Sequence, residues 1–198
     1  MKRKTEQFEW IHSWADDTWN EDLPRVLLVG DSICQGYQEK VREALRGVCC
    51  IDYLATSYAI DSKIYNDLVY AFIKSNKYTI LHINHGLHGE HMSKRTYKSR
   101  LQRLLDRADS TTKIILATST YVYAAGNKEP DALWMKLVNQ RNQAMKKLCE
   151  EKGYAVDDLY AASLSIAVED RHQDGTHYED TGYAVLAEAV VKSIQENL

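Results

Sequence analysis

A serine follows a short apolar run near the start of the chain, in the segment Gly30-Asp31-Ser32-Ile33. The run 26–29 predicts a buried strand, because it is short, aliphatic and ends at a glycine. Open α/β sheets bind ligands beyond the carboxyl ends of their strands, and a helix starting here would offer free backbone N–H groups. By itself the segment is more typical of a helix cap formed by Asp31 or Ser32 than of a nucleophilic serine.

A second reactive pattern lies near the other end of the chain, where Asp174 precedes His177 by three residues. A serine nucleophile needs a base that accepts its proton, and the base needs an acceptor that fixes its tautomer. One loop leading into a helix supplies both groups here. An Asp and a His three residues apart often occur together by chance. Here, however, the pair and Ser32 lie at opposite ends of one domain-sized chain, which predicts a Ser32–His177–Asp174 triad.

These segments resemble those of the SGNH hydrolases, also called GDSL-type esterases. The first block of that family matches residues 30–33, the last matches Asp174-Gly175-Thr176-His177, and Gly86-Leu87-His88-Gly89 falls in register with the third block, Gly-x-Asn-Asp. The resemblance extends over about residues 24 to 196. It implies a serine esterase with Ser32 as nucleophile, His177 as base and Asp174 as the orienting carboxylate.

The oxyanion donors depart from the family pattern. Acyl transfer builds negative charge on the carbonyl oxygen, and the family meets it with the serine N–H, a glycine N–H and an asparagine amide. No glycine follows the second strand, so the backbone N–H of Ser57 becomes a candidate beside that of Ser32. His88 stands at the asparagine position, and Asn84 lies two residues before Gly86. We place Asn84 before His88 because an amide donates at every pH.

Strand and helix patterns alternate along the chain, which favours an α/β fold with a parallel sheet. Strands are expected at 26–29, 48–54, 78–83, 113–118 and 154–159, and helices at 38–45, 61–75, 93–107, 131–152 and 179–196. We expect a three-layer α/β/α sandwich with a five-stranded parallel sheet, in the flavodoxin-like order 2-1-3-4-5 that the resemblance implies. Right-handed crossovers would bring Ser32, Asn84 and the loop 174–177 to one edge of the sheet.

Residues 1–23 stand outside this alternation. Trp10, Ile11 and Trp14 recur at helical spacing, so we expect a helical extension packed on a domain of residues 24–198. A partner-binding or dimerising arm is the alternative interpretation.

Three aromatic residues, Tyr121, Tyr123 and Trp134, flank the loop after the fourth strand. Loops at that edge often shape the substrate pocket, although the same side chains would also serve to cover the end of the sheet. The resemblance suggests short acyl esters, with acetylated carbohydrates first. Lysophospholipid or thioester hydrolysis and acyl transfer use the same triad, and a catalytically silent binding domain is the alternative from another class.

Four histidines, His82, His85, His88 and His91, recur at intervals of three and raise the alternative of a metal site. A predicted strand precedes them and two glycines interrupt any helix there, so we expect neither a metal nor a cofactor.

Composition narrows the classes of partner and location. The chain has 198 residues and a net charge of -3, which gives no basic surface for nucleic acid. It has no long apolar run for a membrane span, and its basic start lacks the apolar core of a secretory signal. Four cysteines without zinc-ligand spacing indicate free thiols in a reducing compartment, so we expect a cytoplasmic protein. The oligomeric state is left open.

Overall fold

The computed structural model describes residues 6–124, 126 and 129–198. The strands found there are β1 (Ile11–Trp14), β2 (Arg25–Gly30), β3 (Cys50–Thr56), β4 (Ile80–Asn84), β5 (Lys113–Ala117) and β6 (Ala155–Asp157). They form one sheet in the order β1-β3-β2-β4-β5-β6. The helices are α1 (Ser32–Ala44), α2 (Lys63–Ser75), α3 (Lys94–Leu105), α4 (Ala132–Lys152), α5 (Leu159–Leu164) and α6 (Asp180–Gln195), with a 3₁₀ turn η1 (Val168–Asp170).

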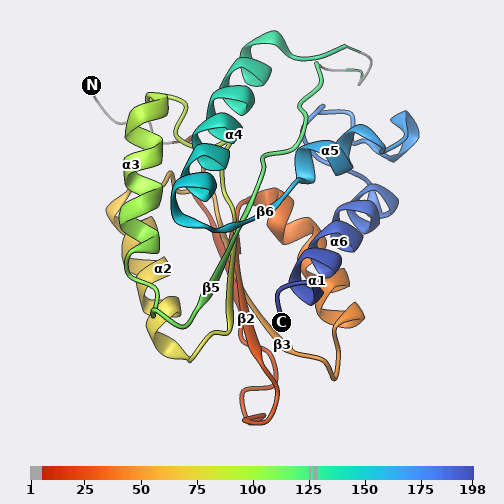
Figure 1. Cartoon of the computed structure of the whole chain (residues 1–198). Coiled ribbons are helices and arrows are strands. Elements are labelled where there is room, and N and C mark those ends of the chain that lie inside the picture. The colour runs from red at the N-terminus through yellow and green to blue at the C-terminus, as the bar shows by residue number, and fades with distance from the viewer. Residues whose placement is uncertain (1–5, 125, 127–128) are drawn as a thin grey trace.

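The predicted three-layer α/β/α sandwich is confirmed, but the sheet formed by the described residues has six strands and not the predicted five, because β1 adds an antiparallel strand at its edge. Strands β3, β2, β4, β5 and β6 are parallel and reproduce the order 2-1-3-4-5. Helices α2, α3 and α4 cover one face of the sheet, and α1, α5 and α6 cover the other (Figure 1). Because successive side chains of a strand alternate between faces, Leu27 and Val29 enter one core and Val26 and Leu28 the other.

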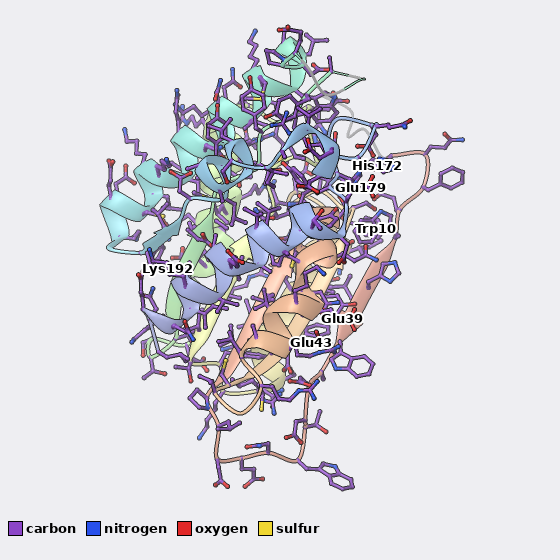
Figure 2. The ribbon with its side chains drawn as sticks, turned by 90° about the vertical axis from the view of Figure 1, so that its right-hand side faces the viewer. Trp10, Glu39, Glu43, His172, Glu179 and Lys192 are labelled. Carbon is purple, nitrogen blue, oxygen red and sulfur yellow. The ribbon has the colours of Figure 1, made fainter. Side chains whose placement is uncertain are left out.

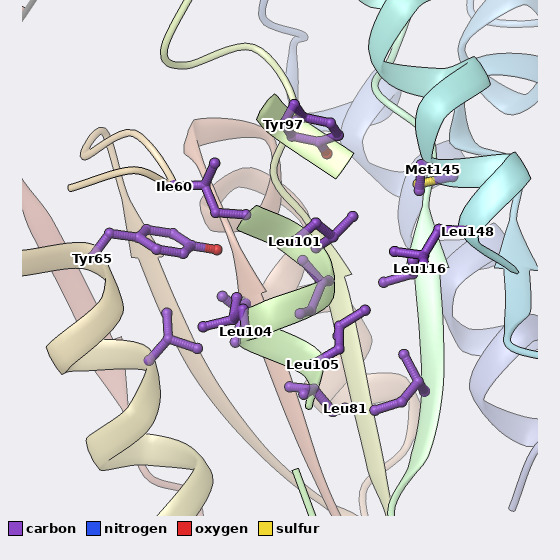
Figure 3. Packing of buried hydrophobic residues seen from close by; sticks show 14 of the residues in the cluster. Ile60, Tyr65, Leu81, Tyr97, Leu101, Leu104, Leu105, Leu116, Met145 and Leu148 are labelled. Atoms are coloured by element: carbon purple, nitrogen blue, oxygen red, sulfur yellow. The ribbon is translucent and has the colours of Figure 1, made fainter. Parts of the chain in front are cut away.

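The larger core lies between the sheet and α2, α3 and α4. Figure 3 shows leucines of α3, among them Leu101 and Leu104, filling the space between Tyr65 of α2 and Leu116 of β5. The opposite core packs α1 against α6. Figure 2 shows α6 running from Glu179, at its start, toward Lys192 near its other end. All four cysteines are buried and unpaired.

The N-terminal helix predicted from Trp10, Ile11 and Trp14 is wrong. The described part of that extension has no helix, and residues 11–14 form β1, which pairs antiparallel with β3 from Ile11 opposite Thr56 to Trp14 opposite Tyr53. An isolated helix of this length is marginal, whereas the free edge of β3 offers a row of unpaired backbone groups. Residues 1–5 of the extension lie outside the described residues.

Helix starts coincide with capping residues. Asp31 caps α1, which therefore begins at Ser32 and not at residue 38, and Ser62, Ser93 and Asp131 cap α2, α3 and α4. The last strand is shorter than predicted, because α5 already begins at Leu159. No helix within the described residues has the length and apolar character needed to cross a bilayer.

A buried ion pair ties the N-terminal segment to the sheet. Arg25 lies 2.7 Å from the Asp52 carboxylate, and both side chains are almost fully buried. Arg25 also donates to the Asp16 carbonyl oxygen at 2.6 Å, and the Asp16 N–H donates to Asp52 at 2.9 Å. Tyr78 donates a further hydrogen bond to Asp52 at 2.8 Å. Removing either charge would leave the other buried without a counter-ion.

We predict that Asp52→Ala lowers the free energy of unfolding by about 3–5 kcal/mol, the cost typical of an orphaned buried charge. Urea denaturation followed by circular dichroism measures this change. The matched control is Asp67→Ala, whose carboxylate pairs with Lys63 on the surface and should contribute little. Equal effects of the two substitutions would contradict the assigned role of the Arg25–Asp52 pair.

Candidate active site

Ser32 lies at the turn between β2 and α1, at the carboxyl edge of the parallel strands. Gly30 ends the strand, and a Cβ there would lie 2.6 Å from the Asn84 carbonyl oxygen and 2.3 Å from the Cys34 Cβ, so the turn requires glycine. Asp31 accepts a hydrogen bond from the Ile33 N–H at 3.0 Å. The backbone N–H of Ser32 is among the first of the helix, where no intrahelical acceptor exists.

The three residues predicted as a triad are in contact. His177 Nε2 lies 2.8 Å from Ser32 Oγ, and His177 Nδ1 lies 2.7 Å from Asp174 Oδ2. The imidazole therefore bridges a hydroxyl and a carboxylate through its two nitrogens. This arrangement can move a proton off Ser32 while the carboxylate holds the ring in one tautomer.

Backbone donors hold the Asp174 carboxylate in its ionised form. Its Oδ1 accepts hydrogen bonds from the Thr176 N–H at 2.8 Å and the His177 N–H at 2.9 Å. Partial burial acts to raise the pKa of Asp174, but the His177 backbone, the His177 ring and the Thr176 N–H outweigh it and hold this pKa well below its usual range. His172 Nδ1 also lies 3.0 Å from Asp174 Oδ2. The orienting group is thus a carboxylate at any ordinary pH.

The backbone of Tyr123 packs against the loop that carries Asp174 and His177 and holds it in place. The Tyr123 N–H donates to the Gly175 carbonyl oxygen at 2.8 Å, and a Cβ on Gly175 would lie 2.1 Å from the Tyr123 carbonyl oxygen. Gly175 also has a φ of +80°, a conformation that L side chains rarely adopt. The Arg171 guanidinium lies 3.9 Å from the centre of the Tyr123 ring. Figure 2 shows His172 in this loop, ahead of α6.

A pocket of about 200 Å³ opens at the triad. It is lined by Glu6, Ser32, Leu87, His88, Trp134, Thr176 and His177. A second concavity of about 360 Å³ shares Trp134 with it and runs over the first turns of α4 and Glu90. Trp134 therefore separates a small recess at Ser32 from a larger, open surface.

Two of the predicted oxyanion donors, Asn84 and Ser57, do not line the pocket at Ser32. Asn84 is buried, does not line the pocket, and donates through Nδ2 to the Thr118 carbonyl oxygen at 3.2 Å. The Ser57 N–H donates to the Trp10 carbonyl oxygen at 3.3 Å, because β1 covers the end of β3. The preference for Asn84 is therefore corrected, because of the two side chains proposed as oxyanion donors, His88 lines the pocket and Asn84 does not.

Two of the predicted aromatic residues support the site without lining the pocket. Tyr121 packs on Tyr123 with ring centres 4.7 Å apart, and on Tyr160 at 5.7 Å. Of the predicted substrate residues, only Trp134 borders the pocket. Tyr121 and Tyr123 instead cover the end of the sheet under the 172–177 loop.

The loop that carries His88 is held by a buried arginine. Arg141 donates to the carbonyl oxygens of Gly89 at 2.9 Å and Met92 at 3.2 Å, and its guanidinium lies 4.4 Å from the centre of the Tyr97 ring. The sequence carries no signal for this contact. Arg141 lies on α4 and the loop follows β4, so the partners are far apart along the chain.

The four histidines spaced by three have separate neighbours. His82 contacts Asp157 at 2.9 Å, His85 packs on the Tyr65 ring, His88 contacts Glu6, and His91 contacts Asp61 at 2.8 Å. The described residues contain no group of three or more side chains able to hold a metal ion.

Glu6, Leu87 and Thr176 line the pocket but were not predicted. Leu87 and Thr176 are neighbours of predicted residues, so their motifs could have pointed to them. Glu6 lies in a segment with no recognisable motif, and the pairing of β1 with β3 and the hydrogen bonds of Ser57 to this segment bring it near the site.

No family model matches the sequence, and no curated protein does. The fold is similar to that of a lipase/acylhydrolase from Enterococcus faecalis, with 18% identity, a TM-score of 0.68 and coverage of 88% of this chain and 96% of that one. A carbohydrate acetylesterase family member from Sinorhizobium meliloti has 13% identity, a TM-score of 0.69 and coverage of 89% and 99%. An acetylxylan esterase from Geobacillus stearothermophilus has 17% identity, a TM-score of 0.66 and coverage of 86% and 94%. The strand order and these likenesses together show that the chain has the SGNH hydrolase fold.

Proposed function

We propose that this protein is a serine ester hydrolase that acts through an acyl-enzyme and needs no metal. The observation that carries this proposal is the continuous contact from Ser32 through His177 to Asp174, at 2.8 and 2.7 Å. A silent binding domain has no need for a hydroxyl, an imidazole and an ionised carboxylate held in this order.

The triad performs the proton transfers of acyl transfer. His177 Nε2 takes the proton of Ser32 as Oγ attacks the ester carbonyl carbon, and Asp174 stabilises the resulting imidazolium. The tetrahedral intermediate then expels the alcohol oxygen, which receives the proton from His177. A water molecule, deprotonated by the same histidine, attacks the acyl-enzyme and releases the acid.

In the proposed mechanism two groups donate to the negative oxygen of the intermediate. One is the backbone N–H of Ser32 at the start of α1, where the helix dipole also favours negative charge. The other is the ring of His88, which lines the same pocket and occupies the position of the family's asparagine.

The shape of the pocket favours a short acyl group on a larger alcohol. Pockets for drug-sized ligands measure about 300–1,000 Å³, so about 200 Å³ accommodates a group such as acetyl but not a long acyl chain. The neighbouring concavity combines Trp134 with Lys136 and Gln140, an aromatic face among polar groups that suits a sugar. The acetylesterases among the structural neighbours support an acetylated carbohydrate, and transfer to a second sugar hydroxyl would use the same acyl-enzyme.

We predict that Ser32→Ala lowers kcat/KM on a chromogenic acetate ester by more than about 10⁴-fold, because the nucleophile is lost. The matched control is Ser110→Ala, an exposed serine before β5, which should keep full activity. Activity of the unaltered protein should survive dialysis against a chelator. Turnover by Ser32→Ala at the original rate would overturn the proposed mechanism.

We predict that Trp134→Ala weakens activity on an acetylated oligosaccharide by up to about tenfold, the worth of one aromatic contact, while activity on a small aryl acetate changes little. Initial rates on the two substrates measure the difference. An equal loss on both would contradict a role for Trp134 in binding the alcohol part. Higher kcat/KM for octanoyl than for acetyl esters would contradict the short-acyl assignment.

We predict that Gly175→Ala lowers kcat by roughly 10²-fold, because its Cβ would push the Asp174–His177 loop off the Tyr123 carbonyl and misplace the base. The control is Gly47→Ala, where φ is +78° but no atom lies within 4 Å of the added Cβ. Both variants should lose stability through the strained φ, as thermal unfolding would show. Only Gly175→Ala should lose activity in the folded state, and a fully active Gly175→Ala would refute the bracing role.

A further inference from the structure

We propose that Glu6 is a positioning residue of the active site, which holds His88 in the charged imidazolium form so that its Nε2–H donates to the oxyanion. The inference rests on the proposed esterase function and adds the group that makes His88 a competent replacement for an asparagine. The group that the charged His88 would bind is the tetrahedral anion formed from a carboxylic ester.

The contact between the two side chains fixes which nitrogen of the His88 ring carries a proton. His88 Nδ1 is hydrogen-bonded to Glu6 Oε1, and both residues line the pocket that contains Ser32 and His177. A carboxylate only accepts, so Nδ1 must carry a proton. Nε2 is then the remaining nitrogen of the ring.

Because Nδ1 is bonded to Glu6, the protonation state of Nε2 decides whether His88 can donate a hydrogen bond to the oxyanion. A neutral ring with its proton on Nδ1 presents a lone pair at Nε2, which would repel a developing oxyanion. The imidazolium has N–H groups on both nitrogens and donates to the oxyanion with a full positive charge. An asparagine in this position would need no such control, because its amide donates in a single charge state.

The charges around His88 favour the imidazolium. Burial acts to lower the pKa of His88, but the Glu6 hydrogen bond and the charges of Asp31, Glu6 and Glu9 outweigh it and raise this pKa above its usual value. The neighbouring ring of His85 lies 5.5 Å away, and burial with the charge of His88 lowers the pKa of His85 to about 3. His85 therefore stays neutral and adds no competing positive charge.

Hydrogen bonds to Ser57, just after β3, hold the segment before β1 near the site. Ser57 donates to Glu9 Oε2 at 2.8 Å, and the Glu6 N–H donates to Glu9 Oε1 at 3.3 Å. The Trp10 N–H donates to Ser57 Oγ at 2.9 Å. Ser57 thus anchors the segment before β1, and this segment carries Glu6 to His88. Figure 2 shows Trp10 and His172 at the same end of the molecule.

The pH dependence of catalysis tests the proposal. His177 must be neutral to act as base and His88 must be charged, so kcat/KM falls as the pH rises through the pKa of His88. Glu6→Gln removes the charge that raises this pKa, so the basic limb should move to lower pH by on the order of one unit, a tenfold change in the protonation equilibrium. Glu6→Asp should restore part of the shift, and Glu43→Gln, an exposed change of the same type on α1, should leave the profile unchanged.

A double-substitution cycle separates this role from a structural one. In His88→Asn the donor no longer titrates, so the basic limb assigned to His88 should disappear and Glu6→Gln should have no further effect. His88→Ala should lower kcat by roughly 10²–10³-fold, the loss typical of one oxyanion donor. An unshifted limb in Glu6→Gln, or the same shift in the His88→Asn background, would overturn the proposal.

An NMR titration distinguishes failure of this inference from failure of the esterase assignment. The pKa of the His88 ring, measured in Ser32→Ala with and without Glu6→Gln, requires no turnover. A lower pKa of His88 in the Glu6→Gln variant supports the charge coupling even if no ester is hydrolysed. An identical pKa in the two proteins would refute the coupling even if the triad proves active.

Discussion

The contact of 2.8 Å between Ser32 Oγ and His177 Nε2 constrains where two distant parts of the chain must meet. It joins two residues 145 positions apart, so the turn after β2 and the loop before α6 must reach the same edge of the sheet. Parallel strands with right-handed crossovers meet that requirement, because every strand then ends at one edge. All residues of β2 and β4, the two central strands that lead to this edge, are buried. At Gly30 and at Gly175 the backbone lies so close to its neighbours that only glycine fits, and these two sites position the turn of Ser32 and the loop of His177.

Two histidines at the pocket are each paired with a carboxylate. In the proposed mechanism the two histidines must be in opposite protonation states. Asp174 orients His177, which must be neutral before it can accept the serine proton. Glu6 stabilises the charge of His88, which must be positive to meet the oxyanion. Sites that run acid and base chemistry together depend on environments that separate the protonation states of such neighbours. Around His88 the bias toward the charged form would come from the Glu6 hydrogen bond and the charges of Asp31, Glu6 and Glu9.

Local sequence patterns predicted the layers, the parallel sheet and the meeting of Ser32, Asp174 and His177, whereas the strand order came from the family resemblance. Apolar runs and capping residues carry that information within a few positions, and the alternation of elements limits the topology. The patterns failed where a distant partner decides the outcome. Trp10, Ile11 and Trp14 have helical spacing, but pairing with the free edge of β3 makes them a strand. Asn84 carries the expected amide, but Thr118 engages it and the ring of His88 reaches the pocket.

The central claim is that Ser32 is an activated nucleophile, and covalent labelling tests it most directly. A fluorophosphonate reacts rapidly only with a serine whose hydroxyl is deprotonated by a neighbouring base, and mass spectrometry of the digested adduct locates the modified residue. We expect a single phosphonate on Ser32, formed quickly in the unaltered protein and slowly in His177→Ala. Absence of labelling at Ser32, or labelling at the same rate without His177, would contradict it.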